Sequence, residues 1–116
     1  SLNIYEDSFQ FIPYSSTLTQ DSKKRLQFIA KQQIAQNALG LRYEIKGYAE
    51  QVGKPAMSLT LSEKRAITVK EFLVTQGVSV QTLIYQGYGE LFDNDKDYGV
   101  KIAVLNAQKC ALNAPN

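Results

Sequence analysis

The chain of 116 residues contains no histidine, no tryptophan, one methionine and one cysteine. The absence of histidine removes the commonest general base, the Ser–His and Cys–His nucleophile pairs and most zinc sites. An enzyme would have to depend on carboxylates, lysine or tyrosine, and no closely spaced pair of inward-facing carboxylates is evident. The sequence therefore predicts a non-catalytic protein that needs no cofactor and no metal.

Long hydrophobic runs are also missing from the chain. No apolar stretch approaches the ~18 residues that span a membrane, and the chain does not start with a signal-like segment. Any membrane attachment is therefore expected to come through a region outside this chain. Cys110 is the single cysteine, so an internal disulfide is excluded and the redox compartment stays undecided.

Positive charge is too sparse for a nucleic-acid-binding module. The formal net charge is only +2, and the densest basic cluster is the run Lys23–Arg25. Nucleic-acid binding normally requires a basic stripe or patch, so this run is interpreted as the solvated face of a helix. We expect no nucleic-acid partner.

Strand-like and helix-like patterns follow one another along the chain. In order, they predict a strand over 3–12 with Phe9 and Phe11 on one face, a helix capped by Thr19 and ended by Gly40, a strand over 41–48, a helix from Pro55 to Gly77, and strands over 82–89 and 100–105. The order β-α-β-α-β-β predicts an α/β (α+β) two-layer sandwich, with two helices packed on one face of a mixed four-stranded sheet. Residues 1–106 are predicted to form this domain, and residues 107–116 a loosely attached tail.

One charged residue lies in the apolar stripe of the second predicted helix, whose inward-facing residues are expected to be Leu61, Val69, Phe72 and Leu73. At 100° per residue, Arg65 falls close to Leu61 and Val69 on the helical wheel. A guanidinium cannot lose its charge, so burial requires paired acceptors. Glu50 follows a predicted strand and could reach the same place.

Two interpretations of this arginine stay open at the level of residue types. In one, Arg65 pairs with Glu50 or extends to water. In the other, Arg65 holds the carboxylate of a zwitterionic ligand while Glu50 holds its ammonium, with Ser58 and Ser62 beside them near the helix N-terminus.

A separate acidic stretch, "DNDKD" at 93–97, resembles the start of a calcium-binding loop. It lacks the glycine and the closing carboxylate of such a loop, which favours a solvated acidic loop.

Three stretches between Gly47 and Glu90 resemble the C-terminal, peptidoglycan-binding domain of the OmpA-like family. They are "GYAE…G", "LSEKRA" with its following V, L and GV, and "GYGE". The resemblance implies a periplasmic domain, associated with the outer membrane, that binds the diaminopimelate stem peptide of peptidoglycan and anchors an envelope protein or complex to the cell wall.

The resemblance also implies site residues. The helix arginine of the family matches Arg65, its strand-end aspartate falls on Glu50, and its helix-opening asparagine falls on Ser58. Gly53 and Ser62 complete the expected ligand-binding set. This chain departs from the family at Ala49, where the family has threonine, and at 97–100, where both arginines of the family's closing "NRRV" are missing.

A second function stays open beside wall anchoring. Divergent domains of this family also occur in large envelope machines, often on lipoproteins. The alternative hypothesis is therefore a degenerate scaffold module that contacts partner subunits in an outer-membrane secretion-system core complex and does not bind peptidoglycan.

Overall fold

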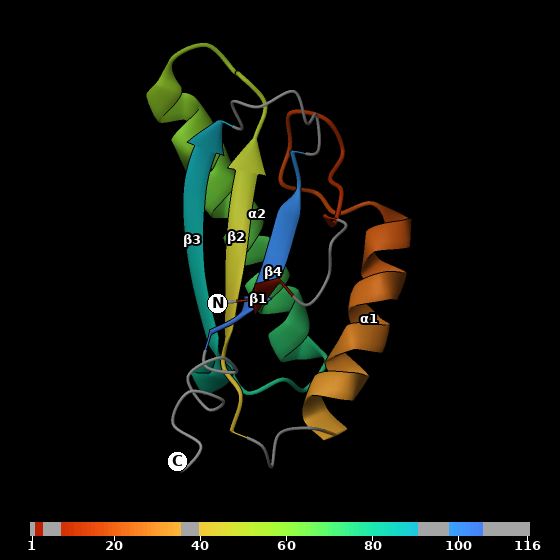
Figure 1. The fold of residues 1–116 in the computed structure, drawn as a ribbon. Coiled ribbons are helices and arrows are strands. Elements are labelled where there is room, and N and C mark those ends of the chain that lie inside the picture. The colour runs from red at the N-terminus through yellow and green to blue at the C-terminus, as the bar shows by residue number, and fades with distance from the viewer. Residues whose placement is uncertain (1, 4–7, 36–39, 91–97, 106–116) are drawn as a thin grey trace, which may run out of the picture.

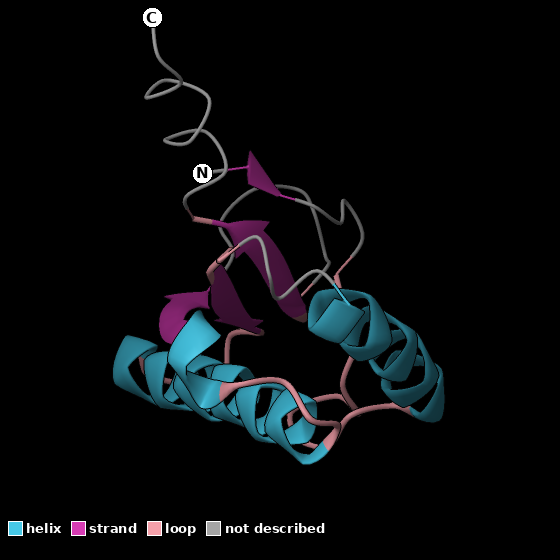
Figure 2. Ribbon diagram, turned by 90° about the horizontal axis from the view of Figure 1, so that it is seen from below, coloured by secondary structure: helices cyan, strands magenta, loops and turns pink. Residues whose placement is uncertain are grey.

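The computed structural model describes residues 2–3, 8–35, 40–90 and 98–105. The elements are β1 (Leu2–Asn3), α1 (Gln20–Ala35), β2 (Tyr43–Ala49), α2 (Pro55–Thr75), the 3-10 helix η2 (Val80–Thr82), β3 (Leu83–Glu90) and β4 (Val100–Val104). The sheet has the order β1-β4-β2-β3, with β2 parallel to β3 and antiparallel to β4. Figure 2 shows both helices on the same side of the sheet, which confirms the predicted α+β architecture of two helices against a mixed sheet.

The first predicted strand, over 3–12, does not form a ladder over its described residues 8–12. Phe9 and Phe11 form only isolated bridges, to Val100 and Leu18. The chain turns at Tyr14, which has a φ of +58°, so no ladder continues on the C-terminal side of Phe11. Instead, three full strands (β2, β3 and β4) make up most of the sheet, and its fourth member is the two-residue β1.

The helix boundaries follow the sequence signals where the structure describes them. Thr19 caps α1, because its Oγ1 accepts a hydrogen bond from the Ser22 N–H at 3.2 Å. Helix α2 begins at Pro55 as predicted, and Gly77 follows its end with a φ of +102°. The predicted end of α1 before Gly40 and the predicted tail lie outside the described residues. None of the helical segments in the described ranges has the length and apolarity needed to cross a membrane.

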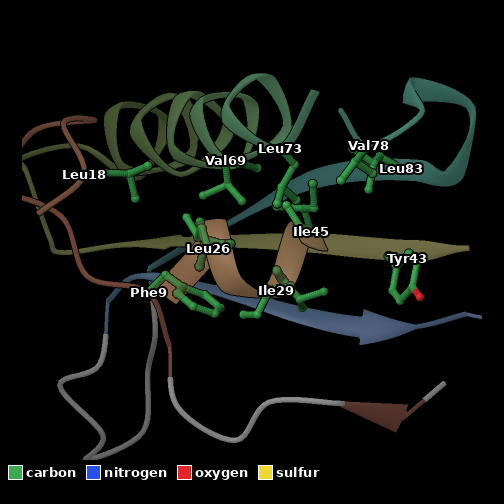
Figure 3. Close-up of a cluster of buried hydrophobic side chains, with 14 of the residues drawn as sticks. Phe9, Leu18, Leu26, Ile29, Tyr43, Ile45, Val69, Leu73, Val78 and Leu83 are labelled. Carbon is green, nitrogen blue, oxygen red and sulfur yellow. The ribbon is translucent and has the colours of Figure 1, made fainter. Parts of the chain in front are cut away.

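The core lies between the sheet and the two helices (Figure 3). Alternation along β2 buries Tyr43 and Ile45 on the helix side, as predicted. On α2 the predicted stripe buries Val69 and Leu73, whereas the flanking Leu61 and Phe72 are only partly covered. The main core residues of the other elements are Phe9, Leu18, Leu26, Ile29, Leu83, Val100 and Ile102.

Two strand glycines allow α2 to lie unusually close to the sheet. A Cβ on Gly47 would overlap the backbone carbonyl oxygen of Ser62, and a Cβ on Gly87 would lie 2.5 Å from the backbone nitrogen of Glu63. Any side chain at these positions would therefore push the helix outward. This close approach places residues 62–65 of α2 directly over the carboxyl ends of β2 and β3.

We predict that Gly47→Ala destabilises the fold by at least about 1–3 kcal/mol, because the added methyl cannot be accommodated against helix backbone. The free energy of unfolding from urea titration measures this effect. Gln51→Ala, at an exposed position just past the same strand, serves as the control and should change stability by less than about 0.5 kcal/mol. Equal stability of Gly47→Ala and the parent would contradict the close approach.

Candidate functional site

Arg65 is the largest fully buried side chain in the described part of the chain, with 1% of its surface exposed. It points from α2 toward the carboxyl end of β2, as its place in the apolar stripe predicted. The Arg65 Nε donates a hydrogen bond to the Ser15 carbonyl at 2.7 Å. Its Nη1 donates to the carbonyls of Tyr98 at 2.7 Å and Tyr48 at 3.2 Å. The Phe11 ring lies against the guanidinium, 5.1 Å from its carbon to the ring centroid.

Glu50 is the charged partner of this arginine. It lies directly after β2, and its Oε1 is 2.8 Å from the Arg65 Nη1. Its other oxygen, Oε2, accepts a hydrogen bond from the Tyr14 N–H at 2.9 Å. Burial by itself raises the pKa of Glu50, but the contacts with the Arg65 guanidinium and the Tyr14 N–H outweigh it and hold the pKa below its ordinary value. The carboxylate is therefore ionised at neutral pH and balances the buried cation.

The pair keeps hydrogen-bonding capacity at the Glu50 carboxylate. The Glu50 Oε1 atom is buried and close to Nη1, but it accepts no aligned hydrogen bond from the described residues. The hydrogen bonds of Arg65 to described residues use Nε and Nη1, not Nη2. Since buried polar atoms are normally satisfied, one further donor beside Oε1 would complete the site.

Ser58 and Ser62 are both fully buried, and both hold backbone in place. The Ser58 Oγ accepts from the Val52 N–H at 3.2 Å and donates to the Glu50 carbonyl at 3.0 Å, and it lies 3.3 Å from the Glu90 Oε1. The Ser62 Oγ donates to the Leu59 carbonyl at 2.7 Å and accepts from the Gly89 N–H at 2.9 Å. These two serines therefore tie α2 to the segments that follow β2 and β3.

Gly53 lies in the exposed loop between β2 and α2, with a φ of +104° that a side chain rarely adopts. The structure thus brings Glu50 and Arg65 into contact and places Ser58 next to Glu50, whereas no hydrogen bond or ion pair among the described residues joins Gly53 or Ser62 to the pair. Within the described ranges no group of three or more His, Cys, Asp or Glu residues could hold a metal ion. The acidic loop "DNDKD" lies outside the described residues.

Several partners of the ion pair could not be found from residue types. The three carbonyls that bind Arg65 belong to Ser15, Tyr48 and Tyr98, and the N–H that binds Glu50 belongs to Tyr14. Main-chain groups carry no signature in a sequence, because every residue has them. The acidic Glu90 at the end of β3 could have been noticed, since parallel neighbouring strands end at the same edge.

The model of the OmpA family matches residues 10–103 of the chain. The chain therefore belongs to the OmpA family. A 46-residue segment is 35% identical to outer membrane protein A of Yersinia pseudotuberculosis serotype I (strain IP32953). That segment is 40% of this chain and 13% of the Yersinia protein, so the chain corresponds to a small part of that relative.

Several solved structures share the fold over most of their length. The C-terminal domain of Helicobacter pylori MotB superposes with a TM-score of 0.75 at 21% identity, covering 97% of this chain and 99% of that one. The peptidoglycan-associated lipoprotein of Burkholderia pseudomallei gives a TM-score of 0.71 at 19% identity, covering 86% and 89%. An outer membrane protein of Borrelia burgdorferi B31 gives 0.69 at 25% identity, covering 91% and 96%. The predicted membership of the OmpA-like family is confirmed.

We predict that Arg65→Met destabilises the protein by about 3–5 kcal/mol, because it leaves a buried carboxylate and buried carbonyls without their donor. Chemical unfolding followed by circular dichroism measures the change. Lys64→Met, at the exposed neighbouring position, is the matched control and should stay within about 0.5 kcal/mol of the parent. A loss of similar size in both variants would contradict a specific role for the guanidinium.

The ion pair also predicts a pH dependence. Because the pKa of Glu50 is lower in the folded protein than its ordinary value of 4.5, the ionised carboxylate stabilises the fold above that pH. This contribution is lost as the pH falls through the folded pKa. The difference in unfolding free energy between the parent and Glu50→Gln should therefore be constant near neutrality and shrink between about pH 5 and pH 3. A difference that does not change with pH would show that the charge of Glu50 is not involved.

Proposed function

We propose that this domain binds the diaminopimelate-bearing stem peptide of peptidoglycan and so anchors an envelope protein or complex to the cell wall, without catalysing a reaction. The observation that carries the proposal is the Glu50–Arg65 ion pair, in which the buried Oε1 accepts no aligned hydrogen bond from the described residues. The hydrogen bonds of Arg65 to described residues use Nε and Nη1. Membership of the OmpA family supports it, as does the shared fold with the peptidoglycan-associated lipoprotein of Burkholderia pseudomallei.

The chemistry of diaminopimelate matches this pair. The end of its side chain carries an ammonium and a carboxylate on one carbon. We infer that the ligand carboxylate takes hydrogen bonds from the Arg65 Nη2, and that the ligand ammonium donates to the Glu50 Oε1. A lysine-type stem peptide has the ammonium but not the carboxylate, so it would satisfy only half of the site.

The other expected site residues receive supporting roles in this proposal. Ser58 orients Glu50 through its backbone carbonyl and fixes the loop at Val52. Ser62 holds the end of β3 near the site, and Gly53 lets the loop turn over it. We place the domain in the periplasm, where peptidoglycan lies, and propose outer-membrane association through a region outside this chain.

A second candidate function is supported by a different observation. The Nε and Nη1 atoms of Arg65 are already occupied by three carbonyls of the same chain, which is how a purely structural arginine is held. On this alternative the domain is a scaffold module that contacts subunits of an envelope assembly, such as a lipoprotein-containing secretion-system core complex, and leaves peptidoglycan unbound.

The experiment that separates the two is an amide NMR titration with purified stem peptides. We predict that a diaminopimelate peptide shifts the amides of Glu50, Val52 and Ser58, and that the matched lysine peptide binds at least about tenfold more weakly, since one charge-assisted contact is worth about 1.5–3 kcal/mol. Arg65→Lys, which keeps the charge but loses the planar fork, should weaken the diaminopimelate peptide to the level of the lysine peptide.

The peptide comparison does not depend on any variant folding correctly. Equal affinity for the two peptides would disprove recognition of the zwitterion. A flat titration up to about 1 mM of either peptide, which corresponds to a binding free energy weaker than about −4 kcal/mol, would favour the scaffold function. In that case a specific partner subunit should co-purify with the full-length protein from its membrane.

A further inference from the structure

Two tyrosines at the carboxyl ends of β2 and β3 stack on the face of the sheet opposite the helices. The two strands run parallel and end at the same edge (Figure 1). Tyr48 has the opposite parity to the buried Ile45, so it points away from the helices. Its ring lies 5.6 Å from the Tyr88 ring, with the planes inclined by 21°. The pairing register shifts after Gly47, and Gly89 has a φ of +80°, so a β-bulge at this point directs Tyr88 toward Tyr48.

The Tyr88 ring is fixed in place and is still accessible. Its hydroxyl donates a hydrogen bond to the Glu44 Oε2 at 2.6 Å, and this bond is the main reason that the pKa of Tyr88 is raised to about 12. The hydroxyl therefore stays protonated near neutral pH. Tyr88 is nevertheless 43% exposed, and no second aromatic ring or cation among the described residues covers its ring. The ring face turned away from Tyr48 is thus open to a ligand.

Polar groups border this ring on the same face of the sheet. Gln86 lies two residues before Tyr88 and therefore shares its face, and its side chain is exposed. The Glu44 carboxylate accepts the Tyr88 hydroxyl at Oε2, and its Oε1 accepts no hydrogen bond from the described residues. An open aromatic face is thus bordered by one amide and one carboxylate.

A sugar ring matches this surface. One face of a pyranose presents C–H groups, which the negative face of an aromatic ring attracts, and its rim carries hydroxyls that pair with amides and carboxylates. An apolar peptide or an acyl chain would leave the Glu44 carboxylate and the Gln86 amide without partners. A nucleotide would bring its phosphate toward the negative charge of Glu44, which opposes binding.

We propose that Tyr88, Gln86 and Glu44 form a second binding surface, the tyrosine platform, for a chain of N-acetylated amino sugars. Sugar C–H groups pack on the Tyr88 ring, the acetamide group exchanges hydrogen bonds with the Gln86 amide, and a hydroxyl donates to the Glu44 Oε1. Peptidoglycan is a polymer of such sugars. That its glycan strand is the one that meets the platform rests on the proposed function, in which the Glu50–Arg65 pair holds the stem peptide.

The tyrosine platform lies within reach of the ion pair. Tyr48 belongs to both places, because its ring supports Tyr88 while its carbonyl accepts a hydrogen bond from the Arg65 Nη1 at 3.2 Å. Glu50 follows two residues later, roughly 7 Å farther along an extended chain. In a stem peptide, the residues between the sugar and diaminopimelate span a similar distance, about 7 Å. One muropeptide therefore reaches both places, which raises its affinity without a new contact at the ion pair.

A comparison of ligands with and without sugars tests the platform. We predict that a muropeptide carrying its N-acetylglucosamine–N-acetylmuramic acid disaccharide binds at least about tenfold more tightly than the same stem peptide without sugars. Tyr88→Ala should remove this gain. Tyr85→Ala is the matched control and should keep it, because Tyr85 is equally exposed (42%) but pairs with Ile45 and so lies on the helix side of the same strand.

Amide NMR titrations give both dissociation constants, and the spectrum of each variant shows whether it is folded. Equal affinity of the parent for the two compounds would overturn the platform while leaving stem-peptide binding in place. A gain that survives in Tyr88→Ala would also overturn it.

Chitotetraose, a neutral oligomer of N-acetylglucosamine, tests the platform without a stem peptide and without any variant. It should shift the amides of Ile84, Gln86 and Tyr88 but not those of Val52 and Ser58 beside the ion pair. These shifts in a protein that binds neither peptide compound would refute the proposed function and retain the platform. An unchanged spectrum at about 10 mM oligomer, which would fill any site with a millimolar dissociation constant, would overturn the platform.

Discussion

The buried guanidinium of Arg65 is the interaction on which the rest of the structure depends. A guanidinium keeps its charge at every accessible pH, so placing it in the interior is possible only if acceptors surround it. Here the acceptors come from three separate segments, namely the loop at Ser15, the end of β2 and the segment before β4, and Glu50 supplies the balancing charge. One side chain on α2 thereby fixes how the loops at the carboxyl ends of the strands are arranged.

The same constraint connects stability with the proposed function. Most of the arginine is used to hold the domain together, but Oε1 of Glu50 accepts no aligned hydrogen bond from the described residues. On the proposed function this site is preorganised, because the protein has already oriented and desolvated the charges that bind the ligand. The departures at Ala49 and Glu50 from the pattern that the resemblance implies fall on this same pair.

Close packing of α2 on the sheet brings side chains of the helix over the edge strand β3. Glycines at positions 47 and 87 let the helix backbone approach the strands, and the Ser62 hydroxyl bonds the Gly89 N–H across the contact. That approach brings Glu63 and Lys70 over the helix side of β3.

The sequence by itself determined what depends on local periodicity and local capping. Helix α2 from Pro55, the Thr19 cap, the alternation of β2 and the inward direction of Arg65 were all predictable, because each depends on residues a few positions apart. The first strand was not, since the alternation of Phe9 and Phe11 indicates a strand but both residues form isolated bridges and the chain turns at Tyr14. Only the tertiary structure decided which groups meet Arg65, because its partners are main-chain atoms of distant segments and only the fold brings them together.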